Sequence, residues 1–235
     1  MKMSPYRTDP KVDYRRLGQL SEEFTQFWSR LHGFYLDAVA GFAFVRNRVE
    51  RDQAYWQERL KGSDLDSEQF QDTRMFTYSQ IFSKDFCTSG IHEATQGEVK
   101  SRNSPDGSNF TTLGQLCLVA FYDFWEEYLR REYAIAKGHL DRNESKGPVI
   151  DECLLKHVRH DLWGDLGLLR NSIVHKNGVA SPKVSRCKLI KWFKPGNPIS
   201  LTPAHMDAIF RALLKYRNEL DKEQYPEHYI QIPLT

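Results

Sequence analysis

Residues 168–178 bring together side chains that can handle a phosphate and a proton. Arg170 is a permanent cation whose forked donors suit a phosphate. His175 titrates near neutral pH and can therefore accept or donate a proton at pH 7. Asn171 lies one helical turn before His175 and could orient its ring. These groups suffice for metal-free RNA cleavage, in which His175 activates the ribose 2′-hydroxyl and Arg170 stabilises charge on the phosphoryl oxygens.

Helical geometry predicts where these side chains point. At about 100° per residue, Asn171 and His175 point roughly 150–165° away from the apolar stripe of their helix, whereas Arg170 lies on its flank, about 65° off. Gly164 and Gly167 fall on the outer side, where each costs about 1 kcal/mol of helix propensity relative to Ala. A close approach by a partner helix or a nucleic-acid backbone would explain them. The core-facing stripe consists of Leu162, Leu166, Leu169 and Ile173.

The elements that position these residues are predicted from apolar periodicity and turn chemistry. Residues 62–112 are the least readable part, because Gly97–Asn109 has the composition of a mobile loop. The prediction is an all-α bundle, one domain over residues 1–235 with an insertion at about 62–112. Its elements are one long helix or two over Leu17–Leu60, a short helix within Glu68–Phe82, helices over Leu113–Lys137 and Pro148–Gly178, a β-hairpin or extended arms over Lys183–Leu201, and a last helix ending near Glu223.

A basic segment follows the Arg/His block. Residues 171–206 contain no Asp or Glu, although the whole chain carries a net charge of only +2. Trp192 and Phe193 lie among the cations, so the segment could hold an RNA backbone and stack bases. A solvated hairpin edge protected by lysines, with both aromatics in the core, is the competing interpretation. The cations are Lys176, Lys183, Arg186, Lys188, Lys191 and Lys194.

The block Arg-Asn-Ser-Ile-Val-His, from Arg170 to His175, matches the Arg-polar-x-x-x-His motif of the higher eukaryotes and prokaryotes nucleotide-binding (HEPN) superfamily. The chain resembles this family also in placing the motif at a helix C-terminus, before a short extended segment and a last amphipathic helix. Phe124, Trp125 and Glu126 in the preceding helix resemble the aromatic-Glu pairing of several bacterial HEPN families. The resemblance covers about Leu17–Leu60 and Leu113–Glu223.

The resemblance implies an HEPN-like bundle acting as a metal-independent endoribonuclease without a cofactor, usually a homodimer whose two Arg/His motifs face each other. Such proteins commonly act in toxin–antitoxin, abortive-infection or other anti-phage systems, which would make an antitoxin or a second defence protein a partner. By analogy Glu126 joins Arg170, Asn171 and His175 in the site, although it is equally well explained as a surface carboxylate. Some family members lack cleavage activity and only bind RNA, nucleotide or a protein partner.

Two further interpretations stay open. A helix C-terminus carrying cations that complement the helix dipole also explains Arg170 and His175, and the chain would then be a structural interaction protein. His157 and His160, beside Asp161, form at most a weak metal site without a clear third ligand. The four scattered cysteines indicate reduced thiols. The absence of a signal peptide and of any long apolar run predicts a cytoplasmic protein without a membrane span.

Overall fold

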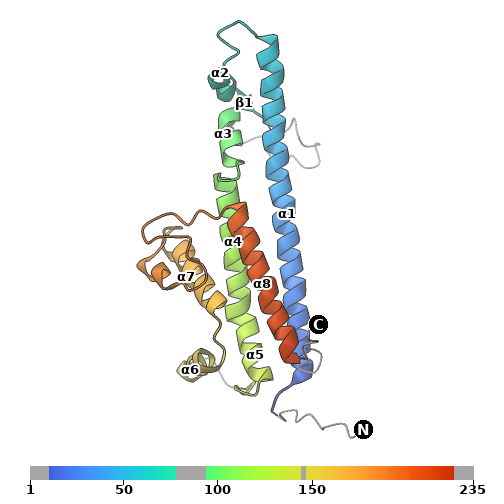
Figure 1. Ribbon diagram of the computed structural model, residues 1–235, viewed down its shortest axis with the longest axis vertical. Helices are drawn as coiled ribbons and strands as arrows, with labels where there is room; N and C mark the ends of the chain where they lie inside the picture. The colour runs from blue at the N-terminus through green and yellow to red at the C-terminus, as the bar shows by residue number, and fades with distance from the viewer. Residues whose placement is uncertain (1–10, 78–93, 144–146, 225–235) are drawn as a thin grey trace, which may run out of the picture. The chain divides into compact units, whose positions relative to one another are not determined.

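The computed structural model describes residues 11–77, 94–143 and 147–224. It confirms an all-α fold with a small β excursion (Figure 1). The described residues of the chain form two compact units, one from those within 1–32, 116–199 and 207–235 and the other from those within 33–115 and 200–206. The helix α1 (Tyr14–Arg59), of 46 residues, contributes to both and is one uninterrupted helix. None of the helices within the described ranges is long and apolar enough to cross a membrane.

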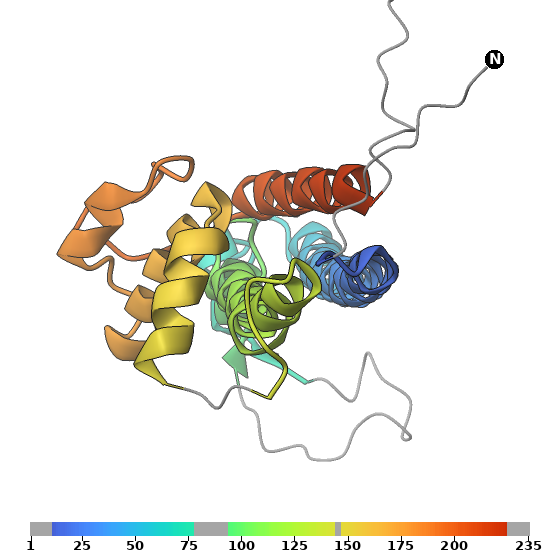
Figure 2. The same ribbon diagram turned by 90° about the horizontal axis from the view of Figure 1, so that it is seen from below.

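The first unit contains α1 up to residue 32, the end of α4 (Ser108–Phe124), a π-helical turn (Trp125–Leu129), α5 (Arg130–Ala136), α6 (Pro148–His157), α7 (Asp161–His175), a 3-10 turn (Pro182–Arg186) and most of α8 (Pro203–Gln224). Aromatic rings form its core. Trp125 stacks on Trp163 at 4.8 Å between centroids, and Tyr216 meets both edge-on. The end of α4 therefore lies between α1 and α7, as Figure 2 shows.

The second unit is built around the later part of α1. It holds α2 (Glu68–Thr73), an antiparallel pair of two-residue strands β1 (Met75–Phe76) and β2 (Ala94–Thr95), α3 (Gln96–Arg102) and the start of α4. The mobile loop predicted over Gly97–Asn109 is wrong over its first half, because Thr95 and Glu98 form a capping box. Val99 of this helix is fully buried in a cluster with Val45, Val49, Phe76 and Ala94.

The predicted helix over Pro148–Gly178 is two helices. Val158 leaves the helical conformation, and the His160 imidazole accepts a hydrogen bond from the Leu162 N–H at 3.2 Å as the N-cap of α7. The predicted helix over Leu113–Lys137 begins earlier, at Ser108, and includes the π-helical turn. The residues of the predicted Glu68–Phe82 helix beyond position 77 lie outside the described ranges.

The segment before α8 is an extended excursion and not a hairpin. Lys183 lies in a 3-10 turn, which Pro182 begins, and a single bridge joins Val179 to Pro198. The residues between follow an irregular path held by main-chain bonds, including those from the Ala180 N–H to the Asn197 carbonyl and from the Ile199 N–H to the Gly178 carbonyl. The last helix ends at Gln224, close to the predicted Glu223.

Candidate active site

The C-terminal end of α7 places the Arg/His block at an accessible position. His175 is the last helical residue. Gly178, with φ of 77°, then turns the chain away and donates its N–H to the Ser172 and Ile173 carbonyls, a bond pattern typical of helix ends. Ser172 is fully buried and binds Ser181 through its hydroxyl, so the turn after the motif is anchored from inside. The imidazole of His175 is exposed.

Arg170, Asn171 and His175 lie side by side. The Arg170 Nη1 is 3.5 Å from the His175 Nε2 and 3.4 Å from the Asn171 Oδ1. A guanidinium cannot accept a hydrogen bond. The contact between Arg170 Nη1 and His175 Nε2 is therefore a hydrogen bond only when Nε2 is unprotonated, and this is the form of His175 that a general base needs. Asn171 was expected to orient His175, whereas its side-chain oxygen accepts from Arg170. The outward directions predicted for Asn171 and His175 agree with their exposure.

A carboxylate holds Arg170 in place. The Asp123 Oδ1, on α4, accepts from the Arg170 Nε at 3.1 Å, and the Arg170 side chain keeps 26% of its surface accessible. This bond occupies the Nε side of the guanidinium and directs Nη1 toward His175. Sequence reasoning missed Asp123. The available signal in the sequence was that Asp123 is the one carboxylate inside the apolar run of residues 113–125.

Glu126 lies near Arg170 without bonding to it. It binds the Arg130 Nη1 through both oxygens, at 3.0 and 3.1 Å, and accepts from the Tyr122 hydroxyl at 3.3 Å. Burial raises the pKa of Tyr122 to about 12, helped by the charge of Glu126, while Arg130 and Arg170 act in the opposite direction. Tyr122 therefore stays a neutral donor. The structure gives Glu126 a part in the surroundings of the motif and leaves the carboxylate role at Arg170 to Asp123.

Tyr122 packs directly against the outer face of α7. A Cβ at Gly167 would stand 2.7 Å from its ring, so any larger residue there would force the ring to move. The close approach expected at Gly167 is thus found, and the approaching group is a side chain of α4. Gly164, one turn earlier, has nothing within 4 Å of its Cβ position. The two glycines therefore have different structural environments.

Asp165 anchors the main chain of the basic segment. This carboxylate is 2% exposed and accepts three main-chain hydrogen bonds of 2.6–2.8 Å, from the N–H groups of Lys188, Leu189 and Ile190. All six cations of the segment are exposed, and Lys188 also pairs with Asp161 at 2.7 Å. Trp192 is 38% exposed and Phe193 half-buried, so the interpretation that places both in the core does not hold for Trp192.

A cavity of about 530 Å³ adjoins the motif on the N-terminal side. Tyr122 and Glu126 contribute to its wall from the α4 side, and Gly164 and Leu168 from α7. Leu168 lies two residues before Arg170, and the charge of Arg170 already acts on Tyr122. The cavity and the motif therefore share one surface of the first unit.

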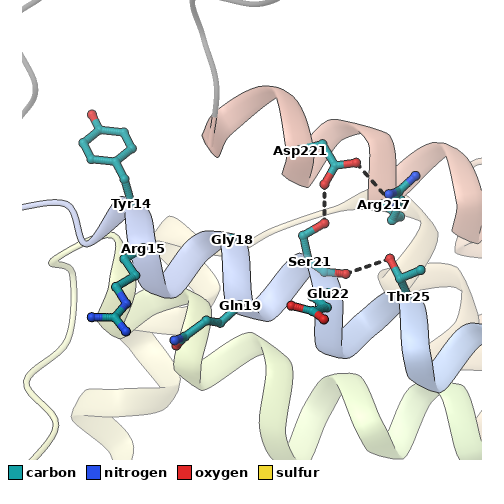
Figure 3. A pocket seen from close by; sticks show the side chains of 9 residues that line it. All are labelled: Tyr14, Arg15, Gly18, Gln19, Ser21, Glu22, Thr25, Arg217 and Asp221. Atoms are coloured by element: carbon teal, nitrogen blue, oxygen red, sulfur yellow. Dashed lines mark hydrogen bonds and ion pairs between the residues drawn. The ribbon is translucent and has the colours of Figure 1, made fainter.

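A second cavity in this unit, of about 630 Å³, lies between the first turns of α1 and the end of α8 (Figure 3). Four of its polar side chains, those of Ser21, Thr25, Arg217 and Asp221, take part in bonds among the lining residues. The Ser21 hydroxyl donates to Asp221, which also pairs with Arg217 at 3.1 Å. Thr25 donates to the Ser21 carbonyl. Figure 3 shows these bonds, and no histidine is among the described residues that line the cavity. The described residues of this cavity therefore do not include the Arg/His pair that the chemistry above needs.

The other histidines singled out in the sequence have different environments. His160 caps α7 through Nδ1 and lies 3.1 Å from Glu219 through Nε2, which accounts for its conformation without a metal. The His157 ring stacks on His139 at 4.4 Å. Across the described part of the chain, no group of three or more His, Cys, Asp or Glu side chains is placed to hold a metal ion.

Comparison of this chain with protein-family models, curated proteins and solved structures finds no match. A function for this protein is therefore inferred from the residues of the site and from the motif.

Proposed function

We propose that this protein is a metal-independent endoribonuclease of the HEPN type. One observation supports this most directly: the partly exposed Arg170 guanidinium is 3.5 Å from the His175 Nε2. A phosphate-binding cation and a group that titrates near pH 7 then act on the same substrate atoms. The exposed cations Lys176, Lys183, Arg186, Lys188 and Lys191 follow in the same unit and supply attraction for the RNA backbone.

In the proposed reaction the neutral His175 removes the proton of a ribose 2′-hydroxyl. The 2′-oxygen attacks the adjacent phosphorus, the bond to the 5′-oxygen of the next nucleotide breaks, and that oxygen takes up a proton. The products are a 2′,3′-cyclic phosphate and a 5′-hydroxyl. Arg170 stabilises the charge that develops on the phosphoryl oxygens. Asp123 holds the guanidinium in position, and Asn171 binds its Nη1.

The resemblance to HEPN proteins extends this proposal to partners and context. The protein would act as a homodimer in the cytoplasm, in a toxin–antitoxin, abortive-infection or other anti-phage system, with an antitoxin or a second defence protein as partner. No cofactor is required for the proposed chemistry.

A second candidate is a non-catalytic HEPN-like module that binds RNA, nucleotide or a protein. One observation favours it: Arg170 already donates to Asp123 and to Asn171. These bonds leave fewer of its donors for a phosphate. The two candidates share the binding surface and differ in whether His175 moves a proton.

Cleavage of total RNA and tRNA in EDTA separates them. Wild type, His175→Ala and Arg170→Ala are compared with His157→Ala, a matched exposed histidine in α6. Loss of a general base lowers the rate by about 10²–10⁴-fold, so His175→Ala should lose cleavage while His157→Ala retains it. Equal cleavage by His175→Ala would overturn the site assignment. RNA binding without cleavage by any of the four proteins would favour the second candidate.

A further inference from the structure

We propose that the cavity beside Tyr122 binds an unstacked base of single-stranded RNA, a short distance along the strand from the bond that His175 attacks. This inference rests on the proposed function for its substrate and adds the substrate class, single-stranded RNA with an accessible base. Proteins that read single-stranded RNA hold splayed bases against aromatic rings or guanidinium planes.

The cavity and the Arg/His block lie along the same helix, α7. Gly164, Leu168, Asn171 and His175 fall within about 60° of one another on a helix with 100° per residue. Gly164 and Leu168 line the cavity, while Asn171 and His175 belong to the Arg/His block. The cavity therefore lies on the same helix face as the motif. At 1.5 Å per residue, Leu168 is about 10 Å from His175 along the axis, within reach of one strand bound along α7.

The walls of the cavity also suit a base. The partly exposed Tyr122 contributes aromatic surface, whereas Trp125 and Trp163, 3% and 2% exposed, stack on each other behind it. The volume of about 530 Å³ lies within the range of small-ligand sites. At Gly164 the wall has no side chain and nothing lies within 4 Å of its Cβ position. The helix accepts an unfavourable residue at a place where a base would have room to enter.

The charged side chains around the cavity favour a nucleotide. The carboxylates of the wall are already engaged: Glu126 with Arg130, Asp161 with Lys188, and Asp165 with three main-chain N–H groups. Arg159 and Arg186 also line the cavity. Both are exposed, and within the described ranges neither has a carboxylate partner. Two guanidinium groups at an aromatic cavity suit the phosphates and the ring of a nucleotide.

The test measures binding of a single-stranded RNA of about 12 nucleotides by fluorescence anisotropy, in the His175→Ala background so that no cleavage interferes. The same RNA with an abasic nucleotide at each position in turn is the comparison. Gly164→Leu fills the open wall. Gly41→Leu is the matched control, because Gly41 is also helical with nothing within 4 Å of its Cβ position.

Stacking of one base contributes enough for a loss of about tenfold in affinity. We expect an abasic nucleotide at one position, and the Gly164→Leu change with intact RNA, each to weaken binding about tenfold, and the two losses not to add. Gly41→Leu should bind like the parent. Equal affinity for intact and abasic RNA at every position would overturn the inference, and this comparison needs no cavity variant to fold. Gly164→Leu binding intact RNA as the parent does would overturn it as well.

The two proposals fail in distinguishable ways. If wild type cleaves nothing while base-dependent binding is lost in Gly164→Leu, the nuclease proposal fails and the base site stands. If wild type cleaves RNA in EDTA with no dependence on the flanking bases, the nuclease proposal stands and the base site fails.

Discussion

The two outer glycines of α7 allow one substitution to be tested in two environments. Gly164→Ala places a methyl group where nothing lies within 4 Å, whereas Gly167→Ala places it 2.7 Å from the Tyr122 ring. Both changes gain about 1 kcal/mol of helix propensity. Only the second forces the ring to move, which costs about 1–3 kcal/mol in overpacking and weakens the hydrogen bond from Tyr122 to Glu126.

We therefore expect Gly164→Ala to raise the free energy of unfolding by up to about 1 kcal/mol. Gly167→Ala should be less stable than Gly164→Ala by about 1–3 kcal/mol. Urea denaturation followed by tryptophan fluorescence reports on this unit, because Trp125 and Trp163 stack in its core. A difference of 2 kcal/mol changes the ratio of folded to unfolded protein by about 30-fold. If Gly167→Ala were as stable as Gly164→Ala, Tyr122 would not pack against α7 as described.

Other parts of the chain give three further tests. Asp165→Asn should lower the free energy of unfolding by about 2–4 kcal/mol in urea denaturation, because the amide keeps only one acceptor oxygen and sets an NH2 donor against main-chain N–H groups that the buried carboxylate now accepts from. Burial alone would raise the pKa of Asp72, but hydrogen bonding, above all from Lys100, holds it below the ordinary value. The stabilisation from ionised Asp72 is present above its unfolded-state pKa and is lost as pH falls through its lower folded-state pKa. The protection of α2 and α3 against hydrogen exchange in acid should therefore change less with pH in Lys100→Met than in wild type. Burial, then Asp165, raises the pKa of the Cys187 thiol to about 12, so mass spectrometry after alkylation at pH 8 should find the half-exposed Cys153 modified before Cys187.

Periodicity predicted the long helices because their apolar positions repeat at helical spacing over many turns. The alternating steps of three and four toward residue 60 predicted one long helix or two, and α1 is one; Pro203 marks the start of α8. The outward positions of Asn171 and His175 followed from the same arithmetic. In contrast, the break before α7 was hidden because Val158 and Leu162 continue one apolar stripe across it.

Pairings between separate elements could not be read from spacing. Asp123 and Arg170 are 47 positions apart and meet only because α4 lies against α7. Glu126, chosen by family analogy, lies three residues from the carboxylate that bonds Arg170. The helix α3 was missed for another reason: the capping box of Thr95 and Glu98 is local, but the nearby Gly, Asn and Ser residues indicated a turn.

The way Asp165 holds the basic segment has a consequence for which substitutions this segment tolerates. The three bonds involve only main-chain N–H groups, so they do not depend on which side chains positions 188 to 190 carry, proline excepted. Lys191 and Lys194 are exposed and can be replaced by acidic residues at little expense to folding. Substitutions in this surface are therefore free to alter ligand preference while α7 and its Arg/His pair stay in place.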